Sequence, residues 1–562
     1  MRAHQTRLLT FFDVQPSEGR LVILVLLYTI LLYAANMLVY TSAYSLFLAT
    51  YDATALPYIY IGVSIVASSL AFFYLRLNKR FALAPLLVGN LLFLVLTLLG
   101  YWLGVRFGQY RWLIFTLPIY YGVVNTITLT AFWSLLGRLF SLQQGKRLFG
   151  LLTAGEHIAT ISMGFLTPFI VQWTGANNLL FVAALIATGA VALLGYLTYA
   201  YRELFNAPEV RSEVVTESHA PHPEPLGTRD TYLLLSYGVF ILYILGLYFV
   251  NNIFYGQVET HYHNADQLAA FLSLLYGIVG VGSLLMQSLI AGRLTQRLGA
   301  RRLLLILPGF LLIMIGFFFI SGVATTFTRL LFWLAVLASC GCTLLDAITW
   351  SAVNLLYQPL PPLQRTRIQT TVTGILYPLS IGLAGLLLFT LSKLLQWNAV
   401  QLAGGLLLIV FGWLFIALWL GRAYPRKLRQ ILAARTAQTF AGIPTPVPNL
   451  PGFKQASLTT SASEISDLLD LWEEAAPEQV AAILGQLLGH TLPEVRLDVY
   501  QRIERLRLTA LLPAIRQHLQ TETAPAIQTA ALRALVAHGE RTHQDELASF
   551  MPNPYSLEQA GG

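Results

Sequence analysis

The stretch Gly292-Arg-Leu-Thr-Gln-Arg-Leu-Gly-Ala-Arg-Arg302 decides the fold, because part of it occurs twice in the chain. Arg293-Leu-Thr-Gln-Arg297 repeats Arg76-Leu-Asn-Lys-Arg80 at an offset of 293 − 76 = 217 positions. The same offset relates Trp133-Ser134 to Trp350-Ser351, since 350 − 133 = 217. One period that carries both a basic turn and an aromatic-polar pair predicts an internal duplication.

A second recurrence supports the duplication. Asn36 and Tyr40 are repeated by Asn251 and Tyr255, at 251 − 36 = 215 and 255 − 40 = 215. We therefore expect two homologous halves. In a chain as apolar as this one, duplicated halves are typical of transporters whose site lies between them.

The composition is that of an integral membrane protein. Of the 562 residues, 56% are hydrophobic and 11% are charged, whereas soluble proteins carry about 25% charged residues. The net charge of +8 is better explained by basic helix ends than by nucleic-acid binding. The two cysteines, Cys340 and Cys342, lie two positions apart in an apolar run and imply no disulfide framework.

About twelve apolar runs are long enough to cross a bilayer core, which takes about 20 helical residues. They are 20–47, 56–76, 83–105, 111–137, 147–172, 177–201, 231–256, 266–292, 301–323, 329–355, 368–393 and 398–421. The sequence thus predicts an all-α membrane protein with two pseudo-symmetric six-helix bundles.

Polar stretches divide the chain further. We expect an N-terminal bundle at 1–202, a linker at 203–229, a C-terminal bundle at 230–425, a second linker at 426–462, a soluble helical domain at 463–550 and a tail at 551–562. Both linkers are rich in proline, which is typical of connections rather than of packed elements.

Lys and Arg predict the orientation. They gather in the turns that follow the even-numbered spans, while the opposite turns hold little beyond Arg106, Arg111, Arg329 and Lys393. Because cytoplasmic loops carry the excess of basic residues, we expect a multi-pass protein of the inner or plasma membrane with both termini in the cytoplasm.

The soluble domain contains a shorter repeat. Pro493-Glu-Val-Arg-Leu-Asp-Val-Tyr-Gln-Arg-Ile503 aligns with Pro525-Ala-Ile-Gln-Thr-Ala-Ala-Leu-Arg-Ala-Leu535, at 525 − 493 = 32. A helical pair with about this period is typical of α-solenoids and resembles HEAT repeats. That interpretation predicts an accessory surface with room for a protein partner; a plain helical bundle is the alternative.

The basic stretch also resembles the signature of the major facilitator superfamily, G-x-x-x-D-R-x-G-R-R. Gly292, Arg297, Gly299, Arg301 and Arg302 match it. Gln296 stands where the family has the Asp that helps to lock the halves together. The resemblance covers residues 20–425 and implies a transporter that works by alternating access.

A narrower resemblance is to the ATP/ADP translocase family. It rests on Phe132-Trp-Ser-Leu-Leu-Gly-Arg138, Gln144-Gly-Lys-Arg-Leu-Phe-Gly150 and Ala154-Gly-Glu156, and relatives of that group carry HEAT-like tails. It implies nucleotide exchange. However, span 20–47 holds no Lys and span 329–355 holds Asp346 instead, so few cations are at hand to offset the desolvation of a polyphosphate.

In the superfamily the first, fourth, seventh and tenth spans line the cavity, and here those spans are unusually polar and aromatic. Asn36 and Tyr40 share a helix face, as do Asn251 and Tyr255. The predicted substrate-binding residues are Asn36, Tyr40, Asn125, Trp133, Asn251, Tyr255, Asp346 and Trp350. The alternative is that these groups only hydrogen-bond between helices.

Charged residues inside spans indicate coupling or gating. Glu156 lies ten residues beyond Lys146, about 15 Å along a helix, and a carboxylate there predicts proton coupling. The predicted coupling or gating residues are Glu156, His157, Arg76, Arg80, Arg293 and Arg297. Alternatively, Glu156 pairs with an arginine such as Arg138 or Arg147, and Asp346 binds a cation, a proton or a gate arginine.

The absence of two sequence motifs excludes some classes of function. The chain has no G-x-x-x-x-G-K-[ST] phosphate loop and no H-E-x-x-H metal motif. We therefore expect no enzyme, cofactor or metal, and partners limited to a small-molecule substrate, the lipid bilayer and a protein on the tail, without nucleic acid. The leading prediction is a secondary transporter of a small organic solute, with proton coupling as one option. Nucleotide exchange and a membrane scaffold that acts through the helical tail are the alternatives.

Overall fold

The computed structural model describes most of the two predicted halves and part of the tail. The described residues are 18–78, 83–108, 110–140, 142–206, 231–323, 328–357, 371–439, 477–522 and 524–537, with the single positions 365, 368, 369, 465, 466, 469 and 473. Every regular element in these residues is helical. The chain separates into two compact units, Met1–Leu420 and Gly421–Gly562, and each is described by itself.

The first unit begins with six long helices. They are α2 (Gly19–Thr50), α3 (Leu56–Asn78), α4 (Leu83–Leu103), α5 (Arg111–Leu139), α6 (Leu142–Thr174) and α7 (Leu179–Ala200). Short segments η1 (Ala53–Ala55), η2 (Gly104–Gly108), η3 (Ala176–Asn178) and α8 (Arg202–Asn206) join or follow them. The helix α2 packs against α5, α6 and α7 and so forms the centre of this half.

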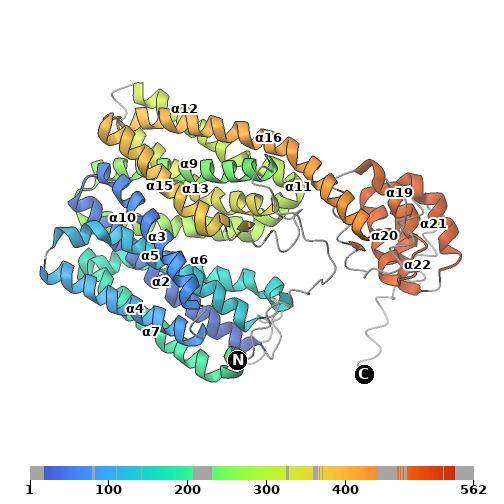
Figure 1. Cartoon of the computed structure of the whole chain (residues 1–562), viewed down its shortest axis with the longest axis horizontal. Helices are drawn as coiled ribbons and strands as arrows, with labels where there is room; N and C mark the ends of the chain where they lie inside the picture. Colours follow the sequence, from blue (N-terminus) through green and yellow to red (C-terminus); the bar gives the residue numbers. More distant parts are fainter. Residues whose placement is uncertain are drawn as a thin grey trace, which may run out of the picture. The chain divides into compact units, whose positions relative to one another are not determined.

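The second half repeats the arrangement. Its helices are α9 (Thr231–His261), α10 (Ala265–Leu285), η4 (Met286–Ala291), α11 (Gly292–Leu303), α12 (Ile306–Val323), α13 (Thr328–Leu355), η5 (Val372–Leu376), α15 (Tyr377–Phe389), η6 (Thr390–Leu394) and α16 (Ala399–Thr439). Figure 1 shows the first half in blue to cyan and the second in green to orange, as two bundles of long helices.

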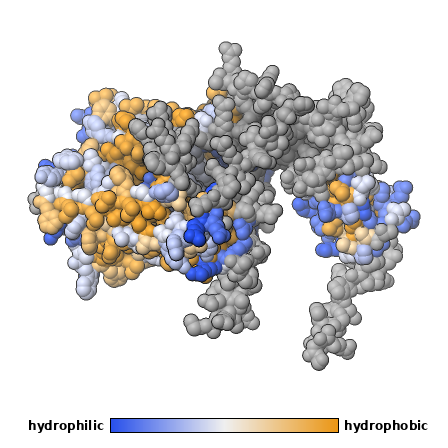
Figure 2. Space-filling model, turned by 60° about the horizontal axis from the view of Figure 1, so that its bottom comes forward, coloured by the Kyte–Doolittle hydropathy of each residue, from blue (hydrophilic) through white to orange (hydrophobic). Residues whose placement is uncertain are grey.

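Ten helices in the described residues are long and apolar enough to cross a membrane. They correspond to ten of the predicted spans. The run at 301–323 contains a shorter apolar helix, Ile306–Ser321, and the run at 147–172 lies in α6, a 33-residue helix that carries Glu156 and His157. Hydrophobic side chains cover much of the surface in Figure 2, as a lipid-facing protein requires.

Close helix pairs join the two halves. The helix α6 packs against α10, and α3 packs against α15. At the first pair, a methyl group added to Gly164 would lie 2.3 Å from the Cα atom of Gly277. At the second, one added to Gly385 would lie 2.9 Å from the carbonyl oxygen of Pro57. Glycine is therefore required at both places for the backbones to approach this closely.

The basic stretch at residues 292–302 forms most of α11. Gly299 interrupts its helical backbone with φ 66° and ψ 167°. Residues other than glycine rarely adopt this conformation. Gly299, which lies just beyond the repeated segment 293–297, thus makes the bend between η4–α11 and the following helix α12.

The second unit contains α19 (Pro477–Leu487), α20 (Pro493–Leu506), η7 (Thr509–Leu511), α21 (Leu512–Leu519) and α22 (Pro525–Ala537). Pro493 and Pro525, which are aligned by the 32-residue repeat, each begin a helix, and α20 packs against α22. The helical character of the tail is confirmed, while its HEAT-like identity stays a prediction.

Candidate functional site

A cluster of tyrosines joins the halves near the ends of α2 and α9. The hydroxyl oxygens of Tyr40 and Tyr255 are 2.6 Å apart. The ring of Tyr44 stacks on that of Tyr255, with centroids 4.8 Å apart and planes 9° from parallel. The ring of Tyr276, on α10, meets Tyr40 edge-on at 5.0 Å, and Tyr121 of α5 meets Tyr40 at 5.2 Å. The structure thus brings Tyr40 and Tyr255 together, in a packed aromatic contact.

Two carboxylates of the second half cap turns of the first half. An oxygen of Glu259 accepts a hydrogen bond of 2.6 Å from the backbone N–H of Ala53. An oxygen of Asp266 accepts one of 2.7 Å from the backbone N–H of Ala176. Charge-assisted bonds of this kind are stronger than neutral ones. We call this end of the first unit, where α2, α6 and α9 finish, the capped end, and the opposite end the basic end.

The predicted asparagines behave differently in the two halves. The side-chain nitrogen of Asn36 donates to the side-chain oxygen of Asn125, 2.9 Å away, inside the first half. The side-chain oxygen of Asn36 is buried and has no hydrogen-bond donor among the described residues. Asn251 is partly exposed and makes no side-chain hydrogen bond to a described residue, whereas its neighbour Asn252 is buried beside Tyr60. The predicted symmetry of Asn36 and Asn251 does not extend to their contacts.

In each half, a carboxyl group in the middle of a long helix lies beside a tyrosine of that half's first helix. Glu156 on α6 lies beside the hydroxyl of Tyr33 on α2. Asp346 on α13 accepts a hydrogen bond from the hydroxyl of Tyr243 on α9. Neither carboxyl forms an ion pair with a described cation, and the described bond of Arg138 goes to the carbonyl of Phe205 at 2.6 Å.

The histidine next to Glu156 contacts the other half. The Nε2 atom of His157 and the Oε1 atom of Gln287 lie 2.6 Å apart and form a hydrogen bond. Because His157 belongs to α6 and Gln287 to η4, this bond joins the two halves through the same helix that carries Glu156. The placement fits the predicted gating role of His157, which stays a prediction.

The two repeated tryptophans lie toward the basic end. Trp133 on α5 is 45% exposed and Trp350 on α13 is 36% exposed. The ring of Trp350 contacts Phe240 at 5.9 Å and lines a cavity of about 240 Å³ with Val353, Asn354, Tyr357, Gln369, Val372 and Thr373. Of the eight predicted substrate-binding residues, Trp350 is thus the one that lines this cavity.

The predicted basic gate residues are described only in part. Arg293 is exposed. Arg80 lies outside the described residues, and so do the side chains of Arg76 and Arg297. Their gating role stays a prediction.

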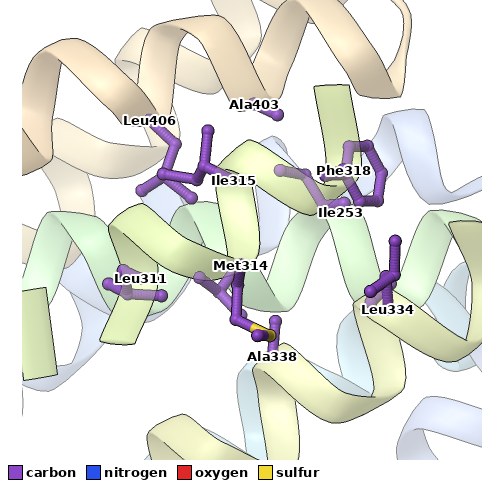
Figure 3. Close-up of a pocket in the computed structure, with 11 residues that line it drawn as sticks. Ile253, Leu311, Met314, Ile315, Phe318, Leu334, Ala338, Ala403 and Leu406 are labelled. Atoms are coloured by element: carbon purple, nitrogen blue, oxygen red, sulfur yellow. The ribbon is translucent and has the colours of Figure 1, made fainter. Parts of the chain in front are cut away.

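A second cavity lies among the helices of the second half. It has a volume of about 30 Å³ and is bounded by apolar side chains of α9, α12, α13 and α16. Figure 3 shows Met314 reaching toward Ala338, while Ile253 and Phe318 line another part of the cavity. A site of this size and lining is a packing gap and offers no polar group to a solute.

Comparison with known families places these features in one class of protein. The sequence profile of the Major Facilitator Superfamily matches residues 21–387. The chain belongs to the Major Facilitator Superfamily. It is therefore a membrane transporter of the secondary type and not an enzyme. A comparison with curated proteins gave no match.

Two solved transporter structures are similar to this chain. A D-xylose–proton symporter has 14% identity, with 70% of this chain and 96% of the symporter covered and a TM-score of 0.50. A bacterial homologue of the iron transporter ferroportin, in an inward-facing state, has 16% identity, coverage of 73% and 98%, and a TM-score of 0.49. At this identity the likeness concerns the fold alone.

Four residues near the contact between the halves were not selected from the sequence. Tyr60, Tyr276, Tyr377 and Gln287 lie on helices outside the four that were expected to line the cavity. The signal for Tyr276 was its position next to Gly277, where α10 touches α6.

Proposed function

We propose that this transporter moves a small uncharged or cationic organic solute and couples its movement to protons through Glu156. The observation that supports the proposal is the position of the Glu156 carboxyl group. It lies inside α6, beside the buried Tyr33, and makes no ion pair within the described part of the chain.

A carboxylate in such a place is costly unless a proton or a cation accompanies it. Protonation removes the charge, and release of the proton requires renewed contact with water. Because α6 is also the helix that packs against α10 of the other half, exposure of Glu156 would change as the halves rock. This links proton uptake and release to the conformational cycle.

The polar groups near the halves' interface favour a solute of low negative charge. The described candidates offer amides at Asn36 and Asn125, hydroxyls at Tyr40 and Tyr255, and the carboxyl of Asp346. None of the described candidate substrate residues is a cation, and a nucleotide polyphosphate would need several. Exchange of nucleotides, implied by the likeness to ATP/ADP translocases, is the less supported proposal.

The membrane orientation and the role of the tail belong to the same proposal. The distribution of Lys and Arg supports cytoplasmic termini in the inner or plasma membrane. The paired helices α20 and α22, each begun by a proline, support a HEAT-like accessory unit that binds a protein partner. A scaffold function would rest on this unit alone.

Transport in proteoliposomes tests the proposal. Purified full-length protein is screened by thermal shift against sugars, amino acids, amines and nucleotides, since bound ligands raise the apparent stability. Uptake of each ligand that binds is then measured with and without a pH gradient. We expect Glu156→Gln to bind the solute but to lose the response to the gradient, while the control Glu203→Gln, at an exposed position of α8, keeps it. An unchanged response in Glu156→Gln would overturn the proposal.

A further inference from the structure

We propose that Asp346, Trp350 and the cavity beside them form the binding site for a small organic amine, whose ammonium group contacts Asp346 and whose apolar body lies against the Trp350 indole. The inference rests on the proposed function, because it names the substrate class of the same transporter. It concerns the second half, whereas the proposed coupling group, Glu156, lies in the first.

The carboxyl group of Asp346 is placed to receive a cation. It accepts a hydrogen bond from Tyr243, which fixes one of its oxygens. Its residue is partly exposed and forms no ion pair with a described side chain. A carboxylate held by one neutral donor still has acceptor sites for an ammonium group, and such charge-assisted bonds are the strong ones.

The cavity lies on the same helix face as this carboxyl group. Asp346, Trp350 and Asn354 recur every four residues along α13, so their side chains share one stripe. Tyr357 lies two residues beyond the end of this helix. Trp350 is one turn, about 6 Å, from Asp346 along the helix axis. The cavity lined by Trp350, Asn354 and Tyr357 thus continues the stripe that begins at Asp346.

The exposed indole is suited to the body of an amine. Trp350 is 36% exposed and forms one wall of the cavity. A tryptophan face attracts a nearby organic cation, and more strongly than other aromatic rings do. It also provides apolar contact for a ring or a short chain.

The polar side chains of Tyr357, Gln369 and Asn354 line the far end of the cavity. The hydroxyl of Tyr357 is buried, with the residue 1% exposed, and has no hydrogen-bond partner in the described part of the chain. Gln369 and Asn354 face one another at 3.5 Å, which is a weak bond and leaves amide capacity for a ligand. A polar substituent opposite the amine would satisfy these groups.

Size and charge exclude other classes. A volume of about 240 Å³ accommodates a molecule with one ring and a short chain and is small for a nucleotide. An anionic group would be repelled by Asp346. A neutral sugar, which also stacks on indole and bonds to amides, is the main rival and leaves the carboxyl group without a cationic partner.

Calorimetric titration of the full-length protein in nanodiscs tests the inference with tyramine as the probe. Its matched neutral analogue is 4-ethylphenol, and D-xylose represents the neutral sugars. We expect tyramine to bind at least about tenfold more tightly than 4-ethylphenol, and Asp346→Asn, which keeps an acceptor for Tyr243, to abolish this preference. Trp350→Ala should weaken tyramine binding, while Trp173→Ala, at an 86% exposed position of α6, should not.

The results separate this inference from the proposed function. Glu156→Gln should bind tyramine as the unaltered protein does, even where proton coupling is lost. Equal binding of tyramine and 4-ethylphenol, absence of tyramine binding at millimolar concentration, or stronger binding of D-xylose would overturn the amine site. Those outcomes would leave the role of Glu156 standing. Because the tyramine comparison needs only the unaltered chain, it decides the question even if Asp346→Asn does not fold.

Discussion

The hydroxyl groups of Tyr40 and Tyr255 lie 2.6 Å apart, and these two residues occupy equivalent positions of the internal repeat. Two equivalent positions that touch one another must lie at the pseudo-symmetry axis that relates the halves. The axis therefore passes beside this pair of hydroxyls. The stacked ring of Tyr44 and the edge-on ring of Tyr276 surround the same point, so the aromatic cluster closes the centre of the molecule near the capped end.

The variant Tyr255→Phe should loosen this closure. It removes one buried hydrogen bond between the halves while keeping the ring, which costs about 1 kcal/mol. That corresponds to a shift of about fivefold toward conformations open at the capped end. Spin labels placed on α3 and α10 would report the shift as a longer distance population.

The control for this variant is Tyr101→Phe, whose hydroxyl bonds to Thr116 within the first half at 3.2 Å. It should leave the distance distribution unchanged. Equal distributions for Tyr255→Phe and the unaltered protein would show that the hydroxyl pair does not hold the halves together.

Removal of the carboxylate caps should open the same end more strongly. Glu259→Gln and Asp266→Asn replace charge-assisted acceptors of the Ala53 and Ala176 N–H groups with neutral ones. Bonds to charged groups contribute about 1.5–3 kcal/mol, so the double variant should expose the capped end by tenfold or more. Thiol labelling of a cysteine introduced at Tyr44 measures this exposure. Thr260→Ala, whose hydroxyl bonds only within its own helix, should label as slowly as the parent.

The repeat and the hydropathy pattern predicted the helical membrane architecture, and the limits of the prediction have physical causes. Apolar runs of span length predicted the helices because the length of a bilayer-crossing helix is fixed by the bilayer. The repeat placed Tyr40 opposite Tyr255 because both lie on helices next to the axis. It did not predict that Asn252, the neighbour of Asn251, is the buried one of the two.

Contacts between different helices could not be predicted from the residue spacing along a single helix. Asn36 turns to Asn125 within its own half, and the cap of Ala53 by Glu259 joins positions 206 residues apart. Such pairings depend on helix crossing angles and on how the halves meet, which spacing along a single helix does not contain.

Substitution of Gly164 should disturb the interface of the halves. In Gly164→Ala the added methyl group would lie 2.3 Å from the Cα atom of Gly277, and backbone must move to admit it. Overpacking of this kind costs about 1–3 kcal/mol, so thermal unfolding should occur at lower temperature. Gly195→Ala is the matched control, because nothing lies within 4 Å of its added methyl group and alanine favours helix. A melting temperature for Gly164→Ala as high as that of Gly195→Ala would contradict the close contact.

Arg502 should be the critical charge of the second unit. Its side chain is 5% exposed and bonds to Glu473 at 2.7 Å and to Asp498 at 2.9 Å. Because Arg502→Ala removes a buried charge together with its bonds to Glu473, Asp498 and Ser466, it should cost about 3–5 kcal/mol. Arg505 contacts the same Glu473 at 2.7 Å, but its side chain is 60% exposed, and Arg505→Ala should cost no more than about 1 kcal/mol. Limited proteolysis of the full-length protein measures both variants by the rate of cleavage within residues 477–537. Similar rates for the two variants would show that burial does not decide the strength of these ion pairs.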